Sequence, residues 1–280
     1  MIRHLSVVGL MLTLLAIAGC TNLWQTMQGE GPRQGTSSSL VDFLYPKGER
    51  PPPQDNIVPT LRTPLRVGLA FVPSNSPNVQ GLSEARKEAL LNTAKQSFLQ
   101  RESISEIVNI PDTYLRSSRG FDTIDQVARL YNLDVIALVS YDQVAITDDT
   151  RASLLYWTII GAYTIKGSRN DVQTFVDTSI FDVATRKLLF RAAGTNVMSS
   201  TSTLVNSTTE TRKAREESFA LAMADMANNL ADEYNRFEAR IKQDKSVIVA
   251  SRSGGAGSMG VLSLLVLLTA VLLRQRRRAT

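Results

Sequence analysis

Two short apolar runs lie near the ends of the chain, and they confine any water-soluble fold to the residues between them. Val7 to Ala18 follows the basic Arg3, and Met259 to Leu273 precedes an arginine-rich end. The first run is too short for a comfortable transmembrane helix and has the layout of a secretory signal peptide. The second would span about 22 Å as a helix, short of the roughly 30 Å hydrocarbon core unless the Gly/Ser residues from Gly254 are included.

Charge is distributed in a way that excludes one class of partner. The chain has 280 residues with 31 Lys+Arg and 26 Asp+Glu, a net charge of +5. The excess comes from Arg3 and from four arginines at the far end: Arg274, Arg276, Arg277 and Arg278. The middle is neutral, so it offers no basic footprint for nucleic acid. By the positive-inside rule, the arginine end stays cytoplasmic and the residues before it are periplasmic.

The end of the first apolar run contains a cysteine motif. Ile17-Ala18-Gly19-Cys20 resembles the bacterial lipobox, with small side chains around the cleaved bond and a thiol to carry lipid. The resemblance implies removal of residues before Cys20 and acylation of Cys20, with several chains anchoring the protein firmly. Thr21, where an inner-membrane retention signal would have Asp, favours the outer membrane. The alternative is a buried cysteine after an uncleaved helix.

The second apolar run follows a pair of glycines, Gly254-Gly255. An intramembrane protease needs a substrate that is locally unwound and extended, and glycine suits this because it favours helix poorly. The glycine pair, apolar helix and arginine cluster resemble the GlyGly-CTERM signal cut by the rhomboid-type protease rhombosortase. With a lipobox on the same chain, the sequence resembles the rhombotarget lipoprotein family. This resemblance implies three partners: the lipoprotein maturation and sorting machinery, the protease and membrane lipid. It also implies an inner-membrane precursor and an outer-membrane product; the alternative is a plain carboxy-terminal anchor.

Four regions are expected from these patterns. Residues 1–20 form the signal peptide and lipobox, and 21–64 form a Pro/Ser/Gly-rich tether. Residues 65–245 form a periplasmic α/β domain, and 246–280 form the sorting tail, with a transmembrane helix at 259–273. Within the tether, the apolar residues Leu40 to Tyr45 indicate either a short docking helix or a partner-binding segment.

The pattern of the middle region predicts an α/β (α+β) fold, a mixed sheet packed by two short helices and one long C-terminal helix. Strands are expected around 67–71, 107–110, 135–139, 154–165, 172–183 and 187–193. Helices are expected after Ser83, after Asp122 and after the Ser/Thr-rich stretch 199–211. The last helix has an apolar stripe at helical spacing, which indicates a core face: Phe219, Met223, Met226, Leu230, Tyr234, Phe237 and Ile241.

One segment of this domain has two interpretations. Leu154 to Ile165 has twelve residues without charge, which is typical of a central strand between two helix layers. It is also long enough for a membrane-crossing strand of about nine to eleven residues. The first interpretation is preferred, and the second would make the protein an oligomeric pore or secretion-channel subunit.

The residue inventory limits the available chemistry. The only His is His4 and the only Cys is Cys20, so a processed chain lacks Ser-His-Asp triads, Cys nucleophiles and Cys/His metal sites. The acidic candidates favour surface or structural roles: Asp148-Asp149 in a turn, Glu216-Glu217 near a helix start, and Asp177 and Asp182 on opposite faces of a strand. We therefore expect no catalytic residues, cofactor or metal.

The function expected from the sequence is a non-enzymatic binding or interaction module of the bacterial cell envelope, with an unidentified envelope protein as partner. The pore subunit is the alternative. A carboxylate-dependent hydrolase would require acids that converge in a pocket.

Overall fold

The structure is a computed structural model that describes residues 33–46, 57–74, 82–116, 120–149, 166–203, 205–244 and 246–252. The strands are β1 (Arg33–Ser38), β2 (Thr60–Thr63), β3 (Leu65–Phe71), β4 (Ile104–Asn109), β5 (Val135–Asp149), β6 (Ser168–Asp182), β7 (Leu188–Ser202) and β8 (Ile248–Ser251). The helices are α2 (Leu40–Leu44), α3 (Glu84–Lys95), the 3₁₀ turn η2 (Gln96–Phe98), α4 (Thr113–Arg116), α5 (Phe121–Tyr131) and α7 (Ser207–Asp244).

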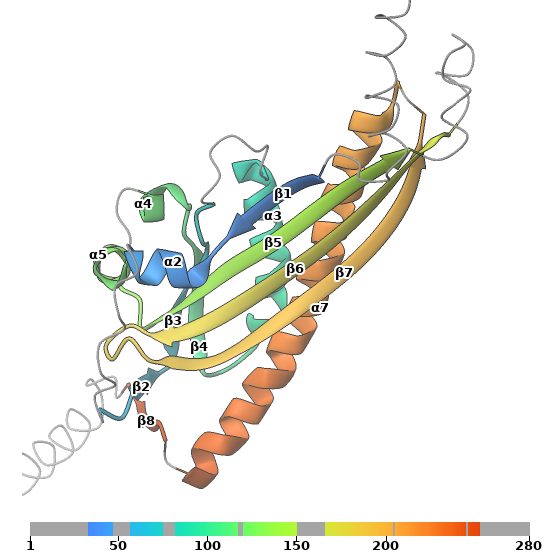
Figure 1. The fold of residues 1–280 in the computed structure, drawn as a ribbon. Helices are drawn as coiled ribbons and strands as arrows, with labels where there is room; N and C mark the ends of the chain where they lie inside the picture. The colour runs from blue at the N-terminus through green and yellow to red at the C-terminus, as the bar shows by residue number, and fades with distance from the viewer. Residues whose placement is uncertain are drawn as a thin grey trace, which may run out of the picture.

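A mixed sheet organises these elements, as the sequence predicts. Its strand order is β4-β3-β5-β6-β7, and β1 pairs with β5 beyond the end of β3. β3 is parallel to β4 and to β5, whereas β5, β6 and β7 form an antiparallel meander of 15-residue strands. A separate two-stranded parallel pair joins β2 to β8. The long meander extends well past β3 and β4, so the sheet has a wide base and a narrow far end (Figure 1).

Helices cover the two faces of the sheet unequally. On one face, α3 and α7 pack over the larger core, which includes Leu69, Phe71, Val139 and Phe219. On the other face, α2 and α5 pack over the base of β3 and β5, around Ile136 and Leu138. Figure 1 shows α7 running diagonally along the whole meander, while α2, α4 and α5 gather near the base. The buried run Val135 to Val139 is therefore covered on both faces, as its continuous apolar sequence predicts.

The apolar stripe of α7 explains why the longest helix lies where it does. Phe219, Met223, Met226, Leu230, Tyr234 and Phe237 are all buried in the larger core, and Ile241 is partly buried against it. Towards the far end of the sheet, buried polar side chains replace this apolar contact. Gln143 and Ser218 both hydrogen-bond to Thr174, and Asn170 accepts from Thr211. The stripe is a core face, and its polar continuation was not expected.

The structure differs from the sequence analysis at the edges of the domain. The range assigned to a tether, 21–64, contains β1, α2 and β2, all of which belong to the folded body. β1 supplies the antiparallel partner of β5 from Tyr141 to Ile146, and α2 docks by burying Phe43 and Leu44. The range assigned to the tail, 246–280, begins with β8, which pairs with β2. A short strand that completes a ladder needs little apolar periodicity of its own, so β1, β2 and β8 had no clear sequence signal. Helix α2 is the short docking helix that was one of the two interpretations of Leu40 to Tyr45.

Three smaller expectations also need correction. Asp148 and Asp149 lie in β5, paired with Arg169 and Ser168, and not in a turn. Residues 199–202 belong to β7, so the Ser/Thr-rich stretch is partly strand. The second helix begins at Phe121 with Gly120 at its N-cap, and Asp122 lies in its first turn.

Several sequence expectations concern residues outside the described ranges. These are the lipobox Ile17, Ala18, Gly19 and Cys20, the pair Gly254 and Gly255, Arg274, Arg276, Arg277 and Arg278, the transmembrane helix at 259–273, and the apolar run Leu154 to Ile165. In the described sheet, β5 and β6 pair directly with each other. Among the described helices, none combines the length and the apolar character needed to cross a membrane.

Candidate functional site

The carboxyl ends of β3 and β4 form a concave, polar region beside the start of α3. From β3 the chain crosses one face through α3 to β4, then crosses the other face through α5 to β5, on the opposite side of β3. Connections that diverge in this way leave a crevice beyond the carboxyl ends of the strands, a place where α/β sheets bind ligands. Here a cavity of about 180 Å³ lies between α3 and the residues after β4, and we call it the α3–β4 crevice. Its lining residues are Phe71, Glu84, Lys87, Glu88, Leu91, Asn109, Ile110, Pro111 and Asp112.

Local sequence chemistry places the charged groups of this crevice. The Ser83 side chain accepts a hydrogen bond from the Arg86 N–H and caps α3, which brings Glu84 and Lys87 to the first turn. Pro111 lies two residues after the end of β4 and cannot continue its ladder, because proline has no N–H to donate. Asp112 therefore lies just past the strand end, opposite the start of α3.

Four side chains form an ion-pair cluster, the Asp112 cluster: Glu84, Lys87, Asp112 and Arg116. The Lys87 ammonium donates to Asp112 Oδ2 and, at 3.0 Å, to Glu84 Oε1. Arg116 donates to the same two carboxylates at 2.8 and 3.1 Å. Asp112 is 3% exposed. Two cations alternate with two carboxylates, so each charge in the cluster is compensated by its neighbours.

These contacts hold the cluster in its charged form. Burial raises the pKa of Asp112, but hydrogen bonds from Arg116 and Lys87 outweigh burial and bring the pKa below its ordinary value. Burial likewise lowers the pKa of Lys87, and hydrogen bonds to Asp112 and Glu84 outweigh it, so the pKa is raised overall. Nearby, burial raises the pKa of Tyr141, which is 4% exposed. All three pKa values move away from neutrality, whereas proton-transfer catalysis favours values near it.

Two oxygens of the crevice have no hydrogen-bond partner in the part of the chain that the structure describes. The Asn109 amide donates from Nδ2 to Asn92 Oδ1 at 2.8 Å, and Asp112 uses Oδ2 for both of its cations. Asn109 Oδ1 and Asp112 Oδ1 are buried and have no hydrogen-bond partner among the described residues. A buried acceptor without a donor costs about 1–3 kcal/mol, so both oxygens are suited to a ligand that brings N–H or O–H groups.

The acidic residues singled out from the sequence lie elsewhere and do not converge. Asp177 pairs with Arg191 at 3.2 Å, and Asp182 accepts from the Thr185 N–H at 2.9 Å in the turn after β6. Glu216 and Glu217 are exposed in the third turn of α7, beyond the reach of the helix-start dipole. Among the described residues, no group of three or more His, Cys, Asp and Glu side chains is placed to hold a metal ion.

Sequence reasoning missed the residues that do converge. Lys87 and Asp112 are far apart in sequence and separated by a helix and a strand, so no local pattern joins them. One signal was available, because Asp112 follows a predicted strand that Pro111 ends, next to a helix that begins after Ser83. An acid at the end of a parallel strand faces the same edge as the helix starts, which is where the crevice forms.

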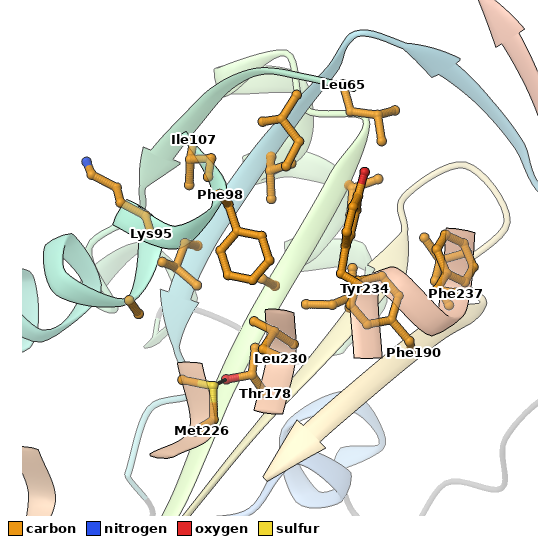
Figure 2. Close-up of a pocket in the computed structure, with 18 of the residues that line it drawn as sticks. Leu65, Lys95, Phe98, Ile107, Thr178, Phe190, Met226, Leu230, Tyr234 and Phe237 are labelled. Atoms are coloured by element: carbon orange, nitrogen blue, oxygen red, sulfur yellow. Dashed lines mark hydrogen bonds between the residues drawn. The ribbon is translucent and has the colours of Figure 1, made fainter. Parts of the chain in front are cut away.

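A second concavity lies beneath the other end of α3. This apolar cavity, of about 80 Å³, separates the base of the sheet from η2 and the second half of α7 (Figure 2). Its polar lining side chains are Lys95, Thr178 and Tyr234. Thr178 donates to the Met226 sulfur at 3.0 Å, and the Tyr234 hydroxyl hydrogen-bonds to Ser103 and Glu238 outside the cavity lining.

Comparison with known proteins gives no family. No family model matches the chain, and no curated protein matches it. The chain is similar to solved structures that include a dodecamer of a PelC variant from Paraburkholderia phytofirmans (13% identity, 72% of this chain and 96% of that chain, TM-score 0.29). A second is protein XCC0632 from Xanthomonas campestris, of family DUF330 (10% identity, 71% of this chain and 94% of that chain, TM-score 0.32). A third is a hemagglutinin homologue from Helicobacter pylori described as neuraminyllactose-binding (8% identity, 68% of this chain and 98% of that chain, TM-score 0.37). At these TM-scores the likeness assigns no function to the chain.

Proposed function

We propose that the protein is a lipid-anchored component of the bacterial cell envelope whose α/β domain is a non-enzymatic binding module, with the α3–β4 crevice as its recognition site. The observation that carries the binding site is a pair of buried oxygens, Asn109 Oδ1 and Asp112 Oδ1, in a crevice at the carboxyl ends of parallel strands. Neither oxygen has a hydrogen-bond partner among the described residues.

The electrostatics of the crevice support binding over catalysis. A general base or nucleophile needs a proton affinity matched to the working pH. Lys87 and Asp112 instead stabilise each other's charge, so the pKa of Lys87 is raised above its ordinary value and the pKa of Asp112 is lowered below it. The Asp112 cluster therefore presents a fixed pattern of charge and acceptors, suited to the N–H or O–H groups of a partner.

A crosslinking experiment in intact cells tests the crevice. Glu88 is exposed and lines the crevice, so a photo-reactive phenylalanine analogue at this position faces any occupant. We expect a discrete adduct upon irradiation, and we expect Asn109→Ala to remove it because the occupant loses an acceptor. The matched control places the same analogue at Glu216, which is exposed on α7. An adduct of equal yield at both positions, or none at Glu88, overturns the crevice as the site.

The anchoring part of the proposal rests on the two ends of the sequence. The lipobox around Cys20 supports acylation, and the Gly254-Gly255 tail supports cleavage by a rhomboid-type protease. Together they support export, passage through the inner membrane, and an outer-membrane product after tail removal.

Intact mass of the full chain isolated from its own membranes tests both processing steps. We expect a species that begins at acylated Cys20 and ends near Gly254. A species that still ends at Thr280 contradicts the sorting-tail proposal. A species that retains residues before Cys20, or lacks acyl chains, contradicts the lipoprotein proposal and leaves the crevice experiment unaffected.

A further inference from the structure

The apolar cavity beneath α7 has the lining of a site for a hydrocarbon chain. Six of its lining side chains illustrate this character: Leu65, Phe98, Ile107, Val135, Leu230 and Phe237. They come from strands β3, β4 and β5, from η2 and from α7, and Figure 2 shows Phe98 and Leu230 on opposite sides of one shared space. The volume of about 80 Å³ is several times the roughly 10–15 Å³ that a single water needs, yet the lining offers water few polar partners.

The cavity follows from how α7 meets the sheet. At Gly194 the helix backbone is so close that an added Cβ would lie 2.2 Å from Met226 N and 2.3 Å from Ala222 O. The helix is fixed at that crossing, and the aromatic residues beyond it keep the layers apart. Tyr234 packs edge-on against Phe98 and Phe190, with ring centroids 6.2 and 6.1 Å apart. Rigid rings cannot relax to fill the gap, so the space persists.

A cation stands at the rim of this space. Lys95, on the last turn of α3, lines the cavity and is only partly buried, as are Ile104 and Ile107 on the neighbouring edge strand β4. In Figure 2 the Lys95 ammonium extends away from the aromatic rings. Among the described residues, Lys95 forms no salt bridge. The Arg101 guanidinium lies 5.1 Å from the centroid of the Tyr234 ring, another lining residue.

We propose that this cavity binds a single fatty acyl chain, with the hydrocarbon inside and an anionic head at Lys95. An apolar interior with a charge at its rim matches an amphiphile, since burying hydrocarbon is favourable and a paired charge can remain in water. A peptide would bring backbone donors and acceptors that this lining cannot satisfy. The proposal is independent of the α3–β4 crevice, which lies at the other end of α3.

Binding of cis-parinaric acid, a fluorescent fatty acid, tests the proposal on the full chain in a steroid-based detergent that lacks an aliphatic tail. We expect saturable binding of one molecule per chain. Ala94→Leu fills the cavity from α3, and Ala137→Leu fills it from β5, because both alanines line it. Each is expected to weaken binding at least about tenfold while the protein still unfolds in one cooperative transition. The matched control is Ala85→Leu on the exposed side of α3, with binding unchanged.

The head-group assignment has its own comparison. Lys95→Glu is expected to weaken binding of the acid about tenfold, and to leave binding of its uncharged methyl ester unchanged. Equal loss for acid and ester removes Lys95 as the head-group site. If the wild-type chain does not bind the acid saturably, or if both filled variants bind like the wild type, the cavity is a packing void and the proposal fails.

Discussion

Gly194 is a residue at which the backbone of helix α7 lies against the sheet with no room for a side chain. A Cβ at this position would lie 2.2–2.7 Å from three backbone atoms of α7, which cannot move aside as a side chain can. This contact lets Ala222 and Met226 rest directly on β7, and it sets the height of the helix above the sheet. Gly194, which has no side chain, therefore has a large influence on the shape of the larger core.

The first prediction is that Gly194→Ala destabilises the protein by roughly 2–3 kcal/mol, because the added methyl group separates α7 from β7. Urea-induced unfolding of the full chain, followed by circular dichroism, measures the loss. Gly35→Ala in β1 is the control, since its Cβ would meet only Gln143 O at 3.8 Å. Gly→Ala lowers the entropy of the unfolded chain and by itself favours folding, so a similar cost at both glycines would mean that the close contact with α7 does not set the loss.

Asp112 is the residue on which the ion pairs of the Asp112 cluster depend. Its carboxylate is buried and accepts from two cations, Lys87 and Arg116, which Glu84 also contacts. Tyr141 lies close enough for Lys87 to lower its pKa against the effect of burial. Removing one partner of such a set leaves a charge in a poorly solvated place.

We predict that Asp112→Asn costs about 3 kcal/mol at pH 7, because the buried Lys87 loses its main counter-charge. The Asp112 pKa is lower in the folded protein than in the unfolded chain. The stabilisation is therefore complete above the ordinary Asp value of about 4 and is lost as the pH falls through the lowered pKa. Unfolding free energies of the two proteins at pH 7 and at lower pH should accordingly converge in acid.

Glu84→Gln is the control for this measurement, since the Glu84 side chain is 53% exposed and its loss should cost at most about 1 kcal/mol. A difference between wild type and Asp112→Asn that stays constant down to the lowest pH would contradict the assigned protonation state.

At the scale of elements, the β2–β8 pair determines how the chain leaves the folded body. β8 is held by the ladder from Thr60↔Ile248 to Thr63↔Ser251, and Arg252 continues the contact. The Arg252 N–H donates to Thr63 O at 2.6 Å, and its guanidinium donates to Asp134 Oδ1 at 2.8 Å. Gly254 follows two residues later. If the tail is cut in the membrane as proposed, the cleavage site lies next to a folded strand, so the protease can draw it in only by releasing β8.

The prediction is that loosening β8 speeds tail removal. Asp134→Ala removes the carboxylate that pairs with Arg252, and a loss of about 1 kcal/mol raises the released population about fivefold. Pulse–chase labelling in cells, with the precursor and product separated by size, measures the rate. Asp232→Ala on the exposed side of α7 should leave it unchanged. An unaltered rate in Asp134→Ala would show that β8 does not limit cleavage.

At the scale of the whole molecule, the two ends of the described chain leave from opposite ends of the body. β1 begins at Arg33 beside Ile146, far along β5, whereas β2 and β8 lie below the first residues of β3 (Figure 1). Val135 and Ile146 are roughly 36 Å apart along β5 at about 3.3 Å per residue. A precursor anchored at both ends, as proposed, would be tethered to the membrane from both ends of the body, and removal of the tail would free one of them.

Spin labels test this arrangement on the full chain with Cys20→Ser. The pair Gly35→Cys and Ser251→Cys should give a distance of about 35 Å or more by pulsed electron resonance, since the labels lie at opposite ends of the folded body. The pair Arg62→Cys and Ser251→Cys, on neighbouring strands, should give a short distance. A short distance for both pairs would contradict the pairing of β1 with the far half of β5.

Sequence patterns were sufficient to predict those elements whose own apolar side chains bury enough surface to fix their position in the fold. The stripe from Phe219 to Phe237 predicted the long helix and its buried face, and the run Val135 to Val139 predicted a strand covered on both sides. The lipobox and the tail remain sequence predictions, since they lie outside the described residues. Local periodicity suffices in these cases because hydrophobic burial acts on each element separately.

Tertiary structure alone decided what depends on residues distant in sequence. β1 and β8 are strands because a neighbour offers a free edge; the sequence of β1 is too polar, and that of β8 too short, to predict it. The far core is polar because Asn170, Thr174 and Ser218 find partners on neighbouring strands and across the interface between sheet and helix. The Asp112 cluster joins α3 to the end of β4, and the apolar cavity exists because Gly194 fixes α7 at one point. Hydrogen bonds, ion pairs and packing gaps depend on where separate elements meet, which no single stretch of sequence specifies.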